Sequence, residues 1–200
     1  MSHPEFFERV PRLRARDPLA AFLGASDDGI LEYGYADAVR LAGHSCPTVA
    51  AAYRITLLGL SRLYGRELPD RGGVRVDIRQ DQEEGVAGVI GAVASLLTGA
   101  AGEGGFRGLG GRFGRRGLLH YGVTLPLDFR FTRLDTGAAV DCGVDLRHVP
   151  ADPEMPLLMQ KCLQGQADRQ ERERFAGLWQ DRVRRLLTEH WDDPRVFVPA

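Results

Sequence analysis

The sequence predicts an α+β domain in which helices pack on a mixed β-sheet, followed by a C-terminal helical extension. Apolar residues recur every three to four positions over 47–64 and again over 157–191, which is the period of an amphipathic helix. Apolar and charged residues alternate over 73–79, which is the period of a strand with one buried face. The predicted order is helix, strand, helix, several strands and a helical tail.

Length and composition restrict the class of protein. A chain of 200 residues with 44% hydrophobic side chains can bury a substantial core. Its net charge of −1 gives no overall attraction to nucleic acid or to an anionic membrane. The longest apolar window, 86–101, is too short and too glycine-rich to span a bilayer. With a polar start and three cysteines, we expect a cytoplasmic protein with reduced thiols that binds neither nucleic acid nor membrane.

In the first third of the chain, two weaker segments precede the central helix. Residues 4–24 predict one or two short amphipathic helices, broken near Pro11 and Pro18. Residues 29–35 predict a short strand. The central helix follows over 47–64 and has a proline at its start and a glycine after its end.

The middle of the chain supplies the remaining predicted strands. The strand over 73–79 is followed by an apolar segment, 83–98, whose small residues suit a buried helix packed closely on a sheet. Residues 118–131 and 138–146 then read as two strands joined by a turn at 135–137.

Three prolines between 150 and 156 mark a boundary, which divides the chain into an α+β domain (1–150) and a helical tail (151–200). The tail predicts two helices broken near Gly165. Its apolar face needs a partner surface, either on its own domain or on the second copy in a symmetric homodimer. That face consists of Phe175, Leu178, Trp179, Val183 and Leu186.

The segment His44-Ser45-Cys46-Pro47 is the strongest indication in the sequence of a functional site. A nitrogen and a sulfur donor lie two positions apart, directly before a helix whose first residue is the proline. A cysteine at a helix N-terminus lies near the positive end of the dipole, which favours the thiolate that binds metals and attacks electrophiles. The alternative is a capped helix in which a small buried thiol only packs.

Two ligands are half of a zinc site, which takes four ligands when closed or three and a water when open. His120 and Cys142 are the best supplementary donors, although each of them taken singly is more often structural. Cys142 alternates with apolar neighbours and should point into the core. Met159 and Cys162 in the tail could offer sulfur ligands to haem iron or copper, but a helical core contact is the simpler interpretation.

The motif and its surroundings resemble a known family. The segment Gly-His-Ser-Cys-Pro over 43–47, followed by a helix with Ala-Ala-Tyr-Arg over 51–54, resembles the FmdE-like family of formylmethanofuran dehydrogenase. Members of that family open with His-Gly-His-x-Cys-Pro-Gly and continue into a helix with a Gly-Tyr-Arg-like segment. The resemblance covers roughly residues 35–145. It implies an α-β-α-β-β-β core with a mixed sheet, a homodimer, and a metal bound near the His/Cys motif.

The sequence departs from the family pattern at several positions. Ala42 stands where the family often has its first histidine, and Thr48 where it has glycine. Residues 88–92 read Gly-Val-Ile-Gly-Ala where the family carries Cys-x-x-Asp-Ala, and 99–101 read Gly-Ala-Ala in place of Gly-Cys-Thr. We therefore expect a sparse, partly open site that holds zinc, with iron, including haem iron, as the main competitor.

The glycine-rich loop over 99–117 supports a rival function. Its backbone N–H groups and four arginines could cradle a small anionic ligand, although no phosphate-binding loop motif is present. A crossover or a segment exchanged between two copies is the plainer interpretation. The rival is then a metal-free protein, either a thiol enzyme using Cys46 or a dimeric small-ligand-binding module using this loop.

Overall fold

The computed structural model describes residues 3–200 and has an α+β fold built on two sheets. A five-stranded mixed sheet has the strand order β4-β3-β5-β6-β7, and a separate antiparallel pair is formed by β1 and β2. Only the β3–β4 pair is parallel in the larger sheet. The strands are β1 (Leu13–Arg16), β2 (Ile30–Tyr33), β3 (Val74–Ile78), β4 (Leu119–His120), β5 (Phe129–Arg133), β6 (Ala139–Val144) and β7 (Phe197–Pro199).

Helices cover one face of the large sheet and extend away from it as an arm. None of the helices within residues 3–200 combines the length and the apolar character that crossing a bilayer requires. The helical elements are η1 (Glu5–Arg9), α1 (Pro18–Phe22), α2 (Tyr35–Ala42), α3 (Pro47–Tyr64), α4 (Ala87–Thr98), η2 (Leu146–His148), α5 (Met155–Leu163), α6 (Arg169–Arg184) and the π-helical turn η3 (Arg185–Glu189).

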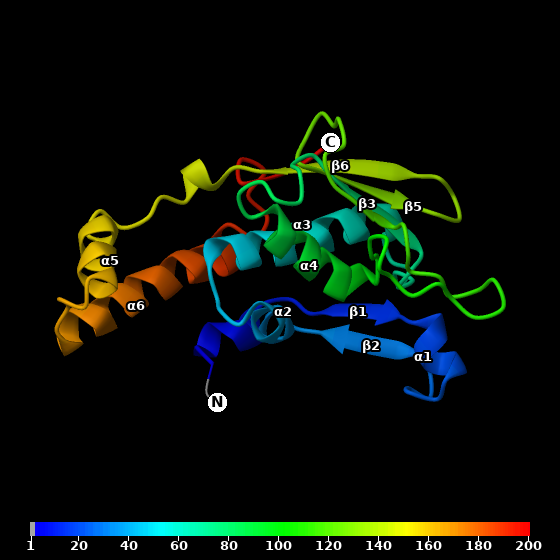
Figure 1. Ribbon diagram of the computed structural model, residues 1–200, viewed down its shortest axis with the longest axis horizontal. Helices are drawn as coiled ribbons and strands as arrows, with labels where there is room; N and C mark the ends of the chain where they lie inside the picture. The colour runs from blue at the N-terminus through cyan, green and yellow to red at the C-terminus, as the bar shows by residue number, and fades with distance from the viewer. Residues whose placement is uncertain (1–2) are drawn as a thin grey trace.

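The body of the molecule has three layers (Figure 1). The large sheet lies on one side, α3 and α4 form the middle layer, and α2 with the β1–β2 pair lies on the other side. Alternation along β3 turns Val74, Val76 and Ile78 toward the helices, and all three are fully buried. The hydroxyl of Tyr53 on α3 donates to the carbonyl of Pro11 at 2.8 Å and so joins the middle layer to the third.

Helix α3 is the central element and is buried over most of its length. Cys46 is its N-cap residue, Pro47 occupies the first turn, and Gly65 ends it with a φ of 58°. Gly59 lets the helix approach the sheet, because a Cβ there would overlap the buried ring of Phe131 on β5. The helix therefore holds the segment 43–47 at a fixed place on the body.

A buried ion cluster joins the N-terminal segment to the middle of the chain. The carboxylate of Asp17 is 4% exposed and accepts from Arg71 at 2.7 Å and from Arg115 at 2.8 Å. It also accepts from the backbone N–H groups of Leu19 and Ala20, which caps α1. Both guanidinium groups are largely buried. The single negative charge of Asp17 therefore faces two buried positive charges, those of Arg71 and Arg115.

The arm consists of α5 and the first part of α6, which project from the body at the left of Figure 1. The second part of α6 returns to the core, where Val183 is fully buried with Leu186 of η3. The chain then pairs with the sheet again as β7, beside β6. Residues 151–200 are therefore an arm together with an integral edge of the main sheet.

Besides the strand β7 in the predicted helical tail, two predicted elements are corrected and most others are confirmed. The first is at residues 4–24, which contain the strand β1 between a 3₁₀ helix and a short α-helix instead of amphipathic helices alone. The second is the predicted strand over 118–131, which is divided into β4 and β5 by the irregular segment 121–128. In the tail, the break near Gly165 is confirmed, and Val183 and Leu186 are covered by their own chain.

Candidate functional site

The segment 43–47 turns between α2 and α3. Gly43 ends α2 in the left-handed conformation, with φ 75°, and places the next residues outside both helices. Cys46 is extended, with φ −148°, and begins α3. His44 is exposed, whereas Cys46 is only 7% exposed, so the two donors differ sharply in their access to solvent.

Each donor has one defined contact. The Nδ1 atom of His44 lies 2.9 Å from the carbonyl oxygen of Ala42. Because a carbonyl oxygen only accepts, Nδ1 carries the proton and the lone pair is on Nε2, which has no partner among residues 3–200. The sulfur of Cys46 accepts from the backbone N–H of Val49 at 3.4 Å, as a capping group does.

Helix α6 anchors the segment 43–47. The sequence did not predict this contact. The indole of Trp179 and the amide of Gln180 both donate to the carbonyl of Ser45, at 3.0 and 3.2 Å. The hydroxyl of Ser45 donates to the Gln180 side-chain oxygen at 2.9 Å and therefore accepts from the hydroxyl of Tyr35 at 3.0 Å. Burial raises the pKa of Tyr35 well above its usual range, so Tyr35 stays a donor. The segment is held firmly from two sides.

The structure does not bring His120 and Cys142 together. His120 lies on β4, and its Nδ1 is 2.8 Å from a carboxylate oxygen of Asp77. Across the sheet, Asp77 pairs with both His120 and Arg130, and Arg130 pairs with Asp141. The side chains of all four residues therefore lie on the sheet face away from the helices. Cys142 is the next residue on β6 and points to the other face, where it is fully buried and burial raises its pKa to about 12.

Two of the departures from the family pattern, at Ala42 and at residues 88–92, meet in space. Ala42 at the end of α2 and the α4 residues Gly88, Val89 and Ala92 line one shallow hollow of about 300 Å³. Its lining carries no side-chain oxygen, nitrogen or sulfur. Within residues 3–200, no three His, Cys, Asp or Glu side chains are grouped so that they could hold a metal ion. Of the donors in the family pattern described above, the chain thus retains His44 and Cys46.

The loop over 99–117 is a hairpin-like projection whose arginines do not converge. Its tip is a Leu109–Arg112 bridge closed by two glycines with positive φ, as in a type I′ turn. Arg115 forms an ion pair with the buried Asp17, and Arg116 forms one with Glu103. Arg112 lies over the ring of Phe113, 4.8 Å from its centroid.

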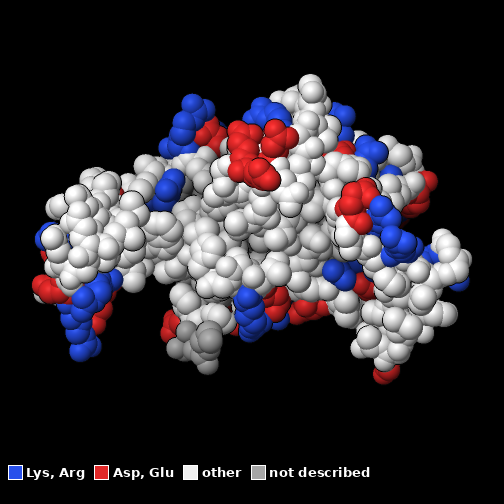
Figure 2. All heavy atoms as spheres, in the orientation of Figure 1, with Lys and Arg blue, Asp and Glu red and all other residues white. Residues whose placement is uncertain are grey.

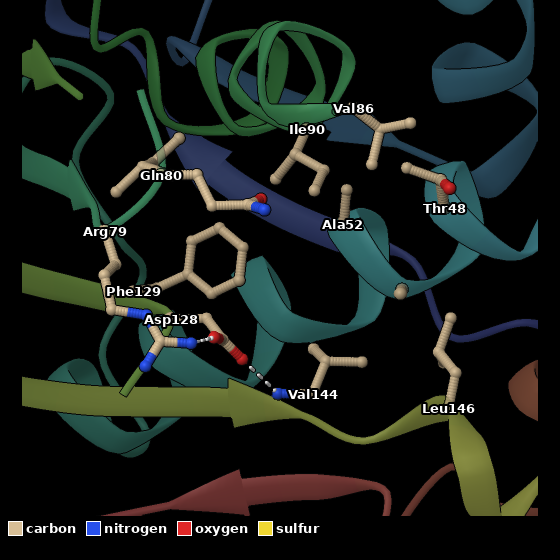
Figure 3. Close-up of a pocket in the computed structure, with 12 residues that line it drawn as sticks. Thr48, Ala52, Arg79, Gln80, Val86, Ile90, Asp128, Phe129, Val144 and Leu146 are labelled. Carbon is tan, nitrogen blue, oxygen red and sulfur yellow. Dashed lines mark hydrogen bonds and ion pairs between the residues drawn. The ribbon is translucent and has the colours of Figure 1, made fainter. Parts of the chain in front are cut away.

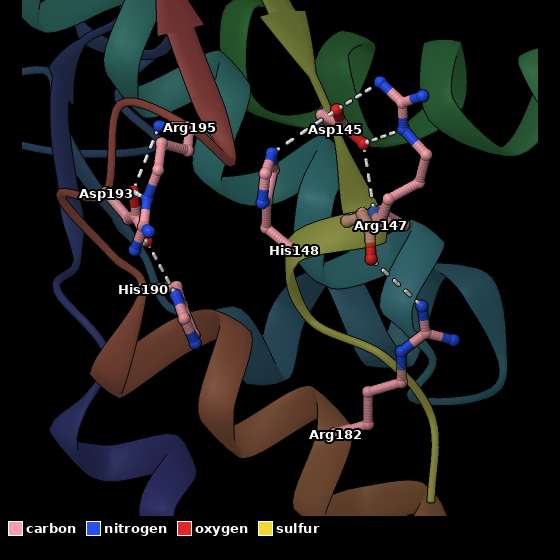
Figure 4. Close-up of polar contacts among 8 residues, drawn as sticks. Asp145, Arg147, His148, Arg182, His190, Asp193 and Arg195 are labelled. Carbon is pink, nitrogen blue, oxygen red and sulfur yellow. Dashed lines mark hydrogen bonds and ion pairs between the residues drawn. The ribbon is translucent and has the colours of Figure 1, made fainter. Parts of the chain in front are cut away.

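A second group of polar contacts lies at the base of the arm (Figure 4). Asp145 binds the guanidinium of Arg147, and Asp193 binds both His190 and Arg195. The hydrogen bond from the Arg147 side chain and that from its backbone N–H hold the pKa of Asp145 well below its usual range. These contacts join residues two or three positions apart and stabilise the two chain segments locally, whereas the guanidinium of Arg182 on α6 donates to the carbonyl of Val149 at 2.7 Å and so joins α6 to the segment that follows β6.

Comparison with known proteins adds no further constraint on this site. No protein-family model matches the chain, and no curated protein is significantly similar to it. The resemblance to the FmdE-like family of formylmethanofuran dehydrogenase therefore depends on the residues of the motif segment and the helix that follows it.

Proposed function

We propose that the chain is a metal-binding protein of the FmdE-like type, with His44 Nε2 and Cys46 Sγ as its primary ligands. The observation that carries the proposal is the contact between His44 Nδ1 and the Ala42 carbonyl. Histidines that bind metals donate their other N–H to a carbonyl or carboxylate in this way, which fixes the tautomer and orients the free nitrogen.

The position of Cys46 supports the same proposal. A metal-bound thiolate there accepts the Val49 N–H and lies at the positive end of an 18-residue helix. A helix N-terminus stabilises a nearby negative charge by roughly 0.3–1 kcal/mol. Mixed nitrogen and sulfur ligation suits zinc first, and iron, including haem iron, is the competitor.

The site is open because one chain supplies two donors. A closed zinc site needs two more ligands, which His120 and Cys142 cannot jointly complete from opposite faces of the sheet. Water, an exogenous molecule or a residue of a second copy fills the other positions. An accessory, sensory or catalytic role is compatible with this geometry, and the thiol enzyme and the small-ligand module are the alternatives if metal is absent.

Metal content tests the assignment. Untagged protein is expected to carry close to one equivalent of zinc by elemental analysis, or a Soret band if the metal is haem iron. Cys46→Ser and His44→Ala are each expected to lose most of it, with the fold unchanged by circular dichroism. Cys162→Ser and His148→Ala are matched controls that should retain it. A metal-free native protein, or unchanged content in both Cys46→Ser and His44→Ala, would refute the proposal.

We place the protein in the cytoplasm as a homodimer. All three cysteines are free thiols, which supports a reducing compartment. The exposed side of α5 carries Leu157 at 60% exposure and Leu163 at 81%. Figure 2 shows the upper part of this arm with few charged side chains. Two copies related by a twofold axis would cover these leucines reciprocally.

The oligomeric state tests the dimer. Light scattering at micromolar concentration is expected to give twice the chain mass of 22.0 kDa. Replacing both Leu157 and Leu163 by glutamate is expected to give the monomer mass, because like charges would face each other across the axis. Leu134→Glu, at a residue 48% exposed in the turn after β5, is the control and should stay dimeric. A monodisperse native monomer would disprove the dimer and leave the fold unaffected.

A further inference from the structure

A cavity of about 220 Å³ lies between the first turns of α3 and α4 and the end of the large sheet (Figure 3). It is distinct from the proposed metal ligands, since no residue of 43–47 lines it. Most of its wall is apolar, and that part includes Ala51, Ala52, Ile78, Ile90 and Phe129.

Small side chains on α3 keep this space open. Ala51 and Ala52 face it from the helix, and neither side chain reaches across to the sheet. Phe129 and Ile78 are 4% and 1% exposed and are fixed in the core, so they cannot swing into the cavity. The cavity is therefore a preformed feature of the packing, as small-molecule sites generally are.

The two charged side chains at the cavity, Arg79 and Asp128, form an ion pair, so their charges compensate each other. The guanidinium of Arg79 pairs with one carboxylate oxygen of Asp128, and the other oxygen accepts from the Val144 N–H at 2.9 Å. Figure 3 shows this pair at one side of the cavity. A charged ligand would meet no uncompensated opposite charge here and would lose its hydration, which is strongly unfavourable.

Two neutral polar groups remain available. The amide of Gln80 points toward the cavity in Figure 3, and Thr48 lies on the opposite side, in the first turn of α3. Among residues 3–200, neither side chain forms a hydrogen bond with another protein group. A primary amide presents a donor and an acceptor side by side, which matches the same arrangement on a ligand.

We propose that this cavity binds a small uncharged organic molecule with an apolar body and a carboxamide-like head. The apolar body lies against Phe129, Ile90 and Ala52, and the head forms paired hydrogen bonds with the Gln80 amide. The cavity lies just below the usual 300–1,000 Å³ range of ligand pockets, so the ligand has on the order of ten non-hydrogen atoms. The site is independent of the metal, and Cys46→Ser should bind the same ligand.

Titration of the full chain with benzamide, followed by NMR, tests the site and its preference for an uncharged head. Saturable shifts are expected for the Ala51 and Ala52 methyl groups and for the Gln80 side-chain NH₂ signals. Benzoate and benzylamine have nearly the same shape but carry a charge, and each is expected to bind at least tenfold more weakly. The absence of saturable shifts at these residues, or equal binding of benzoate, would overturn the proposal.

Gln80→Leu tests the head-group contact. The Gln80 amide bonds no protein group among residues 3–200, so the variant should keep the native spectrum and melting temperature while its affinity for benzamide falls at least tenfold. Binding of toluene, which has no head group, should be unchanged. Gln82→Leu is the matched control, because Gln82 lines a different hollow beside His120, and its affinity for benzamide should equal that of the native protein. Unchanged benzamide affinity in Gln80→Leu would disprove the contact.

Discussion

Replacing Asp17 by alanine is expected to lower the free energy of unfolding by about 3–5 kcal/mol, because breaking a buried ion cluster leaves its remaining charges uncompensated. Asp17 is the sole carboxylate bound to the buried guanidinium groups of Arg71 and Arg115 within residues 3–200. The substitution also removes the cap of α1. Urea denaturation at neutral pH measures the loss. Asp27→Ala, at an exposed aspartate of the following turn, should change stability by no more than about 0.5 kcal/mol.

The same cluster predicts a dependence on pH. Burial by itself raises the pKa of Asp17, but the hydrogen bonds from Ala20 and Arg71 and the charge of Arg115 outweigh it, so the net pKa lies below its ordinary value. A carboxylate with a lowered pKa stabilises the fold above its unfolded pKa, near 3.9, and loses that effect as the pH falls through its folded pKa. Native protein should therefore lose more stability than Asp17→Ala between neutral pH and about pH 2. Equal losses would contradict this role.

Gly59→Ala is expected to destabilise the protein by about 1–3 kcal/mol, although alanine is the better helix former. The added Cβ would overlap the ring of Phe131, which is fully buried and cannot move aside. Thermal unfolding measures the change. Phe131→Leu in the same chain should recover part of the loss, because the shorter side chain makes room for the methyl group.

Gly91→Ala is the matched control for this effect. Gly91 also lies inside a helix, α4, and its added Cβ would meet the hydroxyl end of Tyr121. Tyr121 is partly exposed and can move outward, so the gain in helix propensity of up to about 1 kcal/mol is largely kept. If Gly59→Ala and Gly91→Ala changed stability equally, the close contact of α3 with β5 would not be the reason that position 59 requires glycine.

Local chemistry explains which elements the sequence predicted well. The ends of α3 were predictable because a proline and a glycine fix them, and Cys46, directly before the proline, is its N-cap. The alternation of apolar and charged residues over 73–79 predicted the strand β3 equally well. The strand β1 also alternates, with Leu13 and Ala15 buried, but its short length between two prolines concealed it. The three residues of β7 could not be predicted, because pairing with β6 alone makes them a strand.

The candidate site shows the same limit. The place of His44 and Cys46 before α3 followed from neighbouring residues. Whether His120 and Cys142 could join them depended on strand register, in which a shift of one residue moves a side chain to the opposite face. The hydrogen bond from Trp179 to Ser45 joins residues more than a hundred positions apart, and no local pattern predicts it. The cavity beside Gln80 likewise depends on how three elements meet.

The return of the chain as β7 has a consequence for how the molecule opens. Residues 145–196 separate β7 from its partner β6, so this edge of the sheet is joined by a long excursion through the arm. Three ladder pairs join β7 to β6, with backbone hydrogen bonds from Asp145 to Val196 and between Asp141 and Ala200 on either side of them, whereas β3 and β5 share five pairs. Release of β7 would expose the buried side chains of Val196 and Phe197 but leave the ladders of β3, β5 and β6 in place, so it is a local opening that falls short of global unfolding. It exposes the backbone of β6 as an unpaired edge, on which the β7 segment of another molecule can lie in the same register.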